Sequence, residues 1–146
     1  MCVGDSATII ISRDSITPRY WYHLTAPCGL SVTFRGVSYF DTSHAVVVGD
    51  GGLLFATSNS GATWQSPVAG LTRQTLRAAT GTPGGHVIVV GDSGIILHST
   101  NAGSTWSKLS SNTTHNINGI SINGVGEGYC VGNHGLIEFT SDFGNS

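Results

Sequence analysis

Two arginines and an asparagine stand at one repeated place in the sequence and could bind carboxylate groups. Arg35, Arg77 and Asn118 each lie 14 residues before a glycine that follows a valine. The planar guanidinium of arginine presents a fork of N–H donors that matches a carboxylate, and asparagine adds a further donor. We therefore predict a stepped polar ring of side chains that suits the recognition of carboxylate groups. The alternative is that these are ordinary solvated side chains at strand ends.

The acidic residues do not form the pair that glycoside hydrolysis requires. That reaction needs two carboxyl groups, or a tyrosine nucleophile with an acid partner, placed around one bond. Six of the eight acids fall in turn motifs or at the end of an apolar run: Asp5, Asp14, Asp41, Asp50, Asp92 and Asp142. The other two, Glu127 and Glu138, stand alone. We expect no catalytic residue in the chain.

Histidine, cysteine and glycine do not follow the patterns of metal or phosphate sites. The six histidines show no H-x-H, H-E-x-x-H or cysteine-paired spacing. The glycine-rich turns lack a following Gly-Lys-Ser/Thr and a helix that would hold a phosphate. Cys2 and Cys130 take equivalent places in apolar strands, so we expect small core residues without a disulfide, while Cys28 lies in a loop. No metal and no cofactor is expected.

Composition and charge exclude several classes of partner. The chain has 146 residues, 39% of them hydrophobic, and a net charge of -2 from six basic and eight acidic residues. Nucleic acids and anionic membranes attract clustered cations, and a bilayer span needs about 20 apolar residues; the sequence has neither. We expect no nucleic acid partner and no membrane insertion. Scarce lysine and an N-glycosylation pattern at Asn112 slightly favour an extracytoplasmic, secreted or lumenal, location.

The glycines that follow a valine mark an internal repeat. Gly4, Gly49, Gly91 and Gly132 are separated by 45, 42 and 41 residues. A period of about 40 to 50 residues is typical of propeller blades or helical arrays. The apolar runs between these glycines are short, rich in β-branched residues and bounded by Gly, Asn and Asp, which indicates strands. The sequence therefore predicts an all-β chain.

Each complete repeat contains four expected strands. They are 34–40, 44–49, 52–57 and 63–68 in one repeat, 76–80, 86–91, 94–99 and 105–109 in the next, and 117–122, 129–132 and 135–140 in the third. The second and third strands are continuous apolar runs, as expected when neighbouring blades bury both faces. We predict a β-propeller of four-stranded antiparallel blades of about 42 residues.

The predicted propeller is incomplete. Blades are expected at 31–72 and 73–112, and partial blades at 1–30 and 113–146. A propeller has roughly 4 to 8 blades, and open blades leave sheet faces and edges exposed. We therefore expect a segment of a longer chain, or a module completed by other subunits.

A boxed turn, Ser/Thr-x-Asp/Asn-x-Gly-x-Ser/Thr-Trp, joins the third and fourth strands. The Asp or Asn oxygen can accept nearby backbone N–H groups, glycine permits positive φ, and the tryptophan buries a large ring between blades. The first copy lacks the glycine, and the last stops before the expected tryptophan. The expected members are Ser12, Asp14, Thr57, Asn59, Gly61, Thr63, Trp64, Ser99, Asn101, Gly103, Thr105, Trp106, Thr140, Asp142 and Gly144.

This turn resembles the Asp-box of bacterial neuraminidase repeats. With the preceding Val-Gly-Asp-x-Gly-x-Ile-Leu segment, seen at 90–97, the whole repeat is similar to that of the photosystem II stability and assembly factor (YCF48-like) family. The resemblance covers almost the entire chain and implies a propeller that binds an assembly intermediate through an arginine-rich face. It makes Arg35, Arg77 and Asn118 candidate partner-binding residues, with Arg73 as an outlying member. Sialidases carry an early Phe-Arg-Ile-Pro motif, which Phe34-Arg35-Gly36-Val37 does not match.

We expect a non-catalytic scaffold or protein-interaction module. Its partner would be another protein, or further blades from the same or a neighbouring chain. Two alternatives stay open. One is a carbohydrate-binding or sialidase-like propeller with hydrolase activity in further blades, and the other is a structural repeat of an extracellular glycoprotein assembly.

Overall fold

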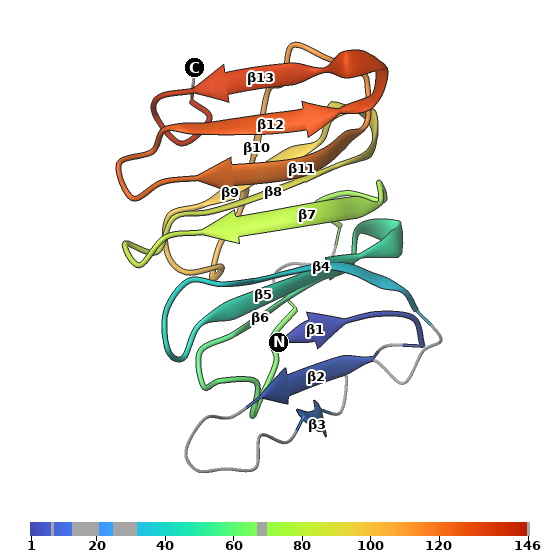
Figure 1. Ribbon diagram of the computed structural model, residues 1–146, viewed down its shortest axis with the longest axis vertical. Coiled ribbons are helices and arrows are strands. Elements are labelled where there is room, and N and C mark those ends of the chain that lie inside the picture. Colours follow the sequence, from blue (N-terminus) through green and yellow to red (C-terminus); the bar gives the residue numbers. More distant parts are fainter. Residues whose placement is uncertain (7, 13–20, 25–31, 67–69, 146) are drawn as a thin grey trace.

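The fold is a stack of four antiparallel sheets that follow one another along the chain (Figure 1). The computed structural model describes residues 1–6, 8–12, 21–24, 32–66 and 70–145. The first sheet contains β1 (Cys2–Val3), β2 (Ile9–Ser12) and β3 (Trp21–Leu24). The second contains β4 (Phe34–Tyr39), β5 (Ala45–Gly49) and β6 (Leu54–Thr57). The third contains β7 (Leu76–Gly81), β8 (Val87–Gly91), β9 (Ile96–Ser99) and β10 (Ser107–Leu109), and the fourth β11 (Ile117–Ile122), β12 (Gly128–Gly132) and β13 (Ile137–Thr140).

One strand register repeats in the second, third and fourth sheets. The first residue of each opening strand lies opposite the anchoring glycine, and the ladder shifts directly afterwards: Phe34 with Gly49, Leu76 with Gly91, and Ile117 with Gly132. In the third sheet β10 completes the order β10-β9-β8-β7. In the second sheet the described part of the fourth strand is a single bridge between Ala56 and Gln65. The predicted blade of four antiparallel strands is thus confirmed most fully by the third sheet.

The turn after each anchoring glycine differs from the prediction. The third strands were expected to begin at residues 52, 94 and 135, but 3-10 turns occupy these positions: η1 (Asp50–Gly52), η2 (Asp92–Gly94) and η3 (Asn133–Gly135). The middle and last residues of each turn have positive φ, which ends the helical turn and aims the chain into the next strand. The third strands therefore start two residues later, at Leu54, Ile96 and Ile137.

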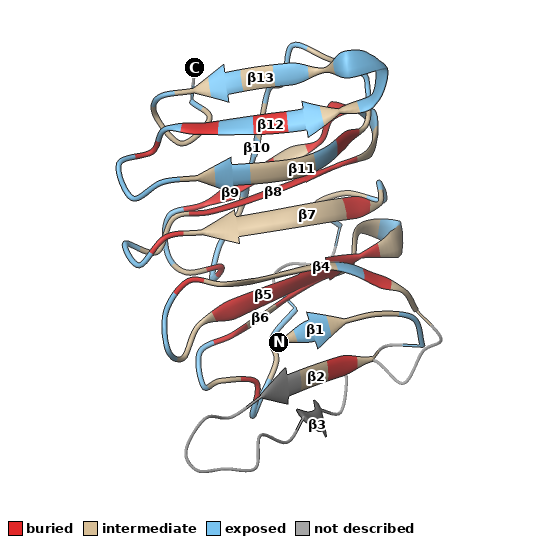
Figure 2. Cartoon of the chain, viewed as in Figure 1, coloured by how far each residue is buried: buried red, intermediate tan, exposed pale blue. Residues whose placement is uncertain are grey.

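The core lies between the sheets. Every residue of β5 and β8 is buried, as predicted from their unbroken apolar runs (Figure 2). In β12, burial instead alternates, and the face that carries Tyr129 and Val131, with Ile137 and Phe139 of β13, is exposed. The equivalent residues of the third sheet, including Ile88 and Val90, are buried against the fourth sheet. This exposed face is therefore the one that blade packing would cover.

The expectation that Cys2 is a core residue is wrong. Cys2 is exposed, whereas Cys130 is buried, and both are free thiols. Val89, at the equivalent place in β8, is buried because the second sheet packs against it. Among the described elements, β1 has its main contacts with β2 and β4, and Cys2 stays in contact with solvent. Cys28 lies outside the described residues.

Candidate functional site

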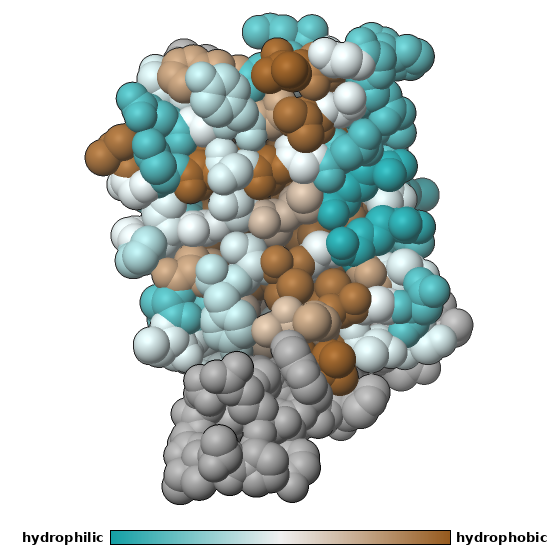
Figure 3. Space-filling view, viewed as in Figure 1, coloured by the Kyte–Doolittle hydropathy of each residue, from teal (hydrophilic) through white to brown (hydrophobic). Residues whose placement is uncertain are grey.

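The structure brings three predicted binding residues into one row. Arg35, Arg77 and Asn118 are the second residues of β4, β7 and β11, which are the opening strands of successive sheets. β4 contacts β7, and β7 contacts β11, so these strands lie side by side (Figure 1). All three residues stand near the 3-10 turns, at an edge of the stack where hydrophilic side chains gather (Figure 3). We call Arg35, Arg77, Asn118 and their bonded partners the rim row.

Each arginine of the rim row pairs with an aspartate of its own sheet. Arg35 donates from Nε and Nη2 to Asp50, with 3.0 Å between Nη2 and Oδ2. Arg77 donates from Nε to Asp92. In the fourth sheet Asn118 Nδ2 donates to Asn133 Oδ1 at 2.7 Å. The sequence-based interpretation assigned the aspartates to turns and missed these pairs, although the spacing of 15 residues is the same in every repeat.

The charged groups of the rim row shift one another's pKa values. The hydrogen bond with Asp50 is the main cause that raises the pKa of Arg35, and the same bond lowers the pKa of Asp50. The neighbouring sheet contributes too, since Asp92 acts on Arg35 and Arg77 acts on Asp50. The Arg35 and Asp50 side chains are 44% and 40% exposed. Solvent screens an exposed pair of this kind, so a carboxylate from a partner can compete for the guanidinium.

Four other predicted site residues do not belong to the rim row. Two of them lie elsewhere in the described structure, and the side chains of the other two are not described. Arg73 is exposed and precedes β7, and Asn112 is exposed in the segment between β10 and β11. Their roles in partner binding and glycosylation stay predictions. Asp14 lies outside the described residues, and of Ser12 only the strand position is described.

The boxed turn of the third sheet is closed by side-chain hydrogen bonds. The Ser99 hydroxyl accepts the N–H of Gly103 at 2.9 Å and donates to Asn101 Oδ1 at 3.0 Å. Asn101 Oδ1 accepts the N–H of Thr105 at 2.8 Å, and Asn101 Nδ2 donates to Thr105 Oγ1 at 2.8 Å. Trp106 Nε1 donates to the carbonyl of Gly103 at 2.9 Å. The turn thus holds its tryptophan in a fixed place between sheets.

The same bonds recur in the neighbouring boxes. In the second sheet Thr57, Asn59 and Thr63 take the places of Ser99, Asn101 and Thr105, and the Gly61 N–H reaches the Thr57 hydroxyl at 2.9 Å. In the fourth sheet Gly144 donates to Thr140 Oγ1 at 2.7 Å, and Thr140 donates to Asp142. The repeated residues therefore hold the hairpins in the same way in three sheets.

Replacing Ser99 by alanine should destabilise the third sheet measurably. Ser99 is 2% exposed, and the loss of its hydroxyl leaves the buried N–H of Gly103 without its acceptor. An unsatisfied buried donor costs about 1–3 kcal/mol. Urea denaturation would measure the change, with Thr100→Ala as the control, because Thr100 is an exposed neighbour. Equal losses in the two variants would contradict this account.

A stack of three rings that the sequence-based interpretation did not find joins the third and fourth sheets. His86 and Phe143 stack with ring centroids 3.9 Å apart, and His86 Nδ1 lies 3.2 Å from His98 Nε2. Burial, and secondly His86, lowers the pKa of His98, which favours the neutral ring. Phe143 stands in its box where Ala102 and Ser60 stand in theirs, all at positive φ. The aromatic residue at this place is the signal that could have revealed the stack.

Other kinds of site were searched for in the described part of the chain. There, no group of three His, Cys, Asp or Glu side chains is arranged to hold a metal ion. Within the same described residues, no helix is long and apolar enough to cross a membrane.

Comparisons with known proteins give a consistent result. The family model described as Photosynthesis system II assembly factor YCF48 matches residues 13–146. A solved structure described as YCF48 bound to D1 peptide is 26% identical with a TM-score of 0.71, over 79% of this chain and 40% of that chain. YCF48 from Cyanidioschyzon merolae is 21% identical with a TM-score of 0.67, over 82% of this chain and 37% of that chain. The chain thus spans about 40% of the length of these structures. No curated protein matches it significantly.

Proposed function

Since the chain belongs to the family of the photosystem II assembly factor YCF48, we propose that it is a non-catalytic β-propeller scaffold that binds a protein partner. The observation that carries the proposal is the rim row, where two guanidinium groups stand at equivalent places on neighbouring strands. A protein similar to this chain is described as bound to a D1 peptide. The partner class proposed here is accordingly a peptide segment with carboxylate groups.

The rim row suits carboxylate recognition at short range. Arg35 uses Nε and Nη2 for Asp50, so its Nη1 group offers two N–H donors that these bonds do not use. Asp50 and Asp92 offset the charges of the two arginines, and long-range attraction of an acidic partner is therefore weak. Selectivity comes from the placing of the donors, and binding should depend on salt less than binding to an unpaired basic patch does.

The lowered pKa values of two aspartates support a role without catalysis. Asp41 accepts the backbone N–H groups of Ser43 and His44, and these bonds are the main cause that lowers its pKa to about 2. Pairing with Arg35 lowers the pKa of Asp50 as well. A general acid in glycoside hydrolysis needs a raised pKa. Both carboxyl groups are shifted in the opposite direction.

The double variant Arg35→Gln/Arg77→Gln is expected to bind a fluorescein-labelled D1 peptide at least tenfold more weakly than the unsubstituted chain. Glutamine removes the charge and the fork of donors without placing an acid beside Asp50 or Asp92. Fluorescence anisotropy would measure the affinity, and thermal denaturation would check that the variant folds. Lys108→Gln is the control, because Lys108 is an exposed cation on β10, at the opposite side of its sheet from β7.

Two results would overturn parts of the proposal separately. Undiminished binding by the double variant would remove the rim row as the site. Failure of the unsubstituted, folded chain to bind the D1 peptide would remove that peptide as the partner.

A further inference from the structure

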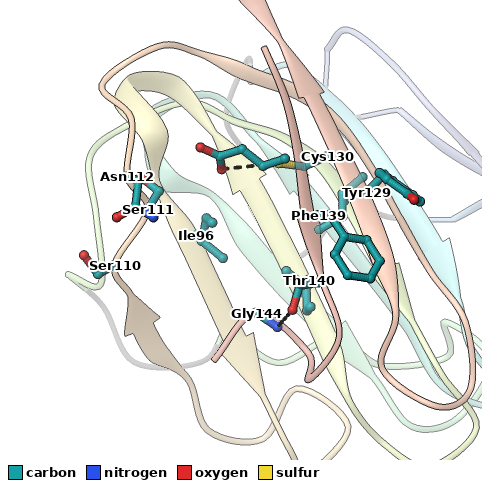
Figure 4. Close-up of a pocket in the computed structure, with 12 residues that line it drawn as sticks. Ile96, Ser110, Ser111, Asn112, Tyr129, Cys130, Phe139, Thr140 and Gly144 are labelled. Carbon is teal, nitrogen blue, oxygen red and sulfur yellow. Dashed lines mark hydrogen bonds between the residues drawn. The ribbon is translucent and has the colours of Figure 1, made fainter. Parts of the chain in front are cut away.

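The ring stack between the third and fourth sheets shows what can fill the space beside a boxed turn. His98 of β9 is 5% exposed, and its Nε2 lies 3.2 Å from Nδ1 of His86. Phe143 stacks on His86, and the box that carries Phe143 is closed by the hydrogen bond from Gly144 to Thr140 (Figure 4). Three rings therefore pack together at this end of the strands.

The equivalent space between the second and third sheets contains smaller side chains. Ala56 takes the register position of His98, and Ala102 takes the box position of Phe143. Phe40 packs beside Ala102 and compensates for one of the two missing rings. A cavity of about 150 Å³ remains beside Ala56, where the other ring would lie.

The walls of this cavity come from both sheets. His44, Ala56 and Gln65 of the second sheet line one side, and residues 101–104 of the next box line the other. His44 directly precedes β5, just as His86 directly precedes β8. An apolar cavity of about 150 Å³ binds benzene, and an imidazole ring is smaller than benzene. The space therefore suits a five-membered ring, and its polar walls favour a ring that contains nitrogen.

The ring of His44 is held so that one nitrogen remains for a ligand. Its Nδ1 lies 2.7 Å from Asp41 Oδ2, and Phe40 stacks on it with ring centroids 5.9 Å apart. Backbone N–H groups lower the pKa of Asp41 to about 2, so this carboxylate only accepts hydrogen bonds. The proton of the neutral His44 ring therefore lies on Nδ1, and Nε2 is an acceptor. The hydrogen bonds of this ring within the described structure are all at Nδ1.

We propose that the cavity binds the imidazole ring of a histidine from a partner polypeptide. The ring lies against Ala56, in the place that corresponds to the ring of His98, and its N–H donates to Nε2 of His44. The buried histidine pair of the third sheet is thus reproduced with one ring from a second molecule. The cavity lies at the opposite end of the strands from the rim row, so the proposal does not depend on the function of that row.

Peptide titrations followed by ¹H–¹⁵N NMR would test the site. The peptide Gly-Gly-His-Gly-Gly, at about pH 7.5, where histidine is mostly uncharged, should shift the backbone signals of residues 101–104 in a saturable way. The same peptide with phenylalanine in place of histidine should bind about fivefold more weakly, because it cannot donate to His44 Nε2. Free imidazole is the probe for the cavity alone and should shift the same signals.

A substitution that fills the cavity from within gives the second test. Ala56→His recreates the pair found in the third sheet, so it should abolish the shifts that the histidine peptide causes. Ala62→His is the control, because Ala62 is an exposed residue of the same box that does not line the cavity. This control adds an imidazole group without filling the space, and it should bind the peptide as the unsubstituted chain does.

Three results would overturn the proposal. The first is unchanged binding of the histidine peptide by Ala56→His, and the second is equal binding of the histidine and phenylalanine peptides. The third is a shift of these signals by free imidazole but not by the histidine peptide, because the occupant would then be a free heterocycle and not a partner polypeptide. If Ala56→His fails to fold, the comparison of the two peptides and imidazole still decides.

Discussion

Replacing Gly94 by alanine is expected to lower the free energy of unfolding by about 3–5 kcal/mol, a large loss for one methyl group. Gly94 ends η2 with φ of +73°, and a Cβ atom there would overlap the backbone carbonyl of Thr113. It would also lie 2.6 Å from Ser111 Oγ. A backbone group in the linker between β10 and β11 cannot move aside without disturbing both sheets. Urea denaturation followed by circular dichroism would measure the loss.

Gly135→Ala is the matched control for this prediction. Gly135 ends the equivalent turn η3 with φ of +74°, and a Cβ atom there meets nothing within 4 Å among the described atoms. Only the left-handed backbone is then unfavourable, at about 1–2 kcal/mol. The difference between the two variants isolates the contact with Thr113. Equal losses would show that this contact does not limit stability.

Replacing Trp106 by alanine should cost about 3–5 kcal/mol, because it opens a cavity between the second and third sheets. The ring packs against the clusters around Leu97 and around Val46, so it joins residues of both sheets. The variant also loses the hydrogen bond from Nε1 to Gly103. Chemical denaturation would measure the loss, and a loss below about 1 kcal/mol would contradict this role for the tryptophan.

Phenylalanine substitutions separate the packing of the ring from its hydrogen bond. Trp64 Nε1 is buried and has no acceptor among the described residues, whereas Trp106 Nε1 donates to Gly103. Removing an unpaired buried donor costs little or stabilises, and removing a paired one leaves an acceptor unsatisfied. Trp64→Phe should therefore cost less than Trp106→Phe. The reverse order would mean that packing of the ring decides both results.

The fold could be predicted because several features of the sequence indicate the same architecture. The 41- to 45-residue spacing, the short apolar runs and the boxed turns all favour antiparallel blades, and the register confirms them. The 3-10 turns were not predicted, because the middle residue of each turn also has positive φ, and this residue is Gly51 in η1 but Ser93 in η2 and His134 in η3. Without a glycine at that place, the residue types do not indicate the turn.

The candidate sites were predicted less well, because they depend on which side chains meet across a sheet. Asp50 and Asp92 were recognised as turn residues, but their bonds to the arginines need the ladder between first and second strands. Ala56 is one more apolar strand residue in the sequence, and only its register, equivalent to that of His98, reveals that it lines a cavity. Spacing predicts which residues are equivalent, whereas geometry decides what each one touches.

Each arginine of the rim row pairs with an aspartate of its own sheet, so the charge of the rim row is balanced within each blade. Arg35 with Asp50, and Arg77 with Asp92, are complete within one repeat, and Asn118 with Asn133 is the uncharged version. Duplication of a blade therefore adds a donor and its counter-charge together. A propeller built from such repeats can gain or lose blades, or exchange a charged pair for a neutral one, without accumulating net charge along the rim row.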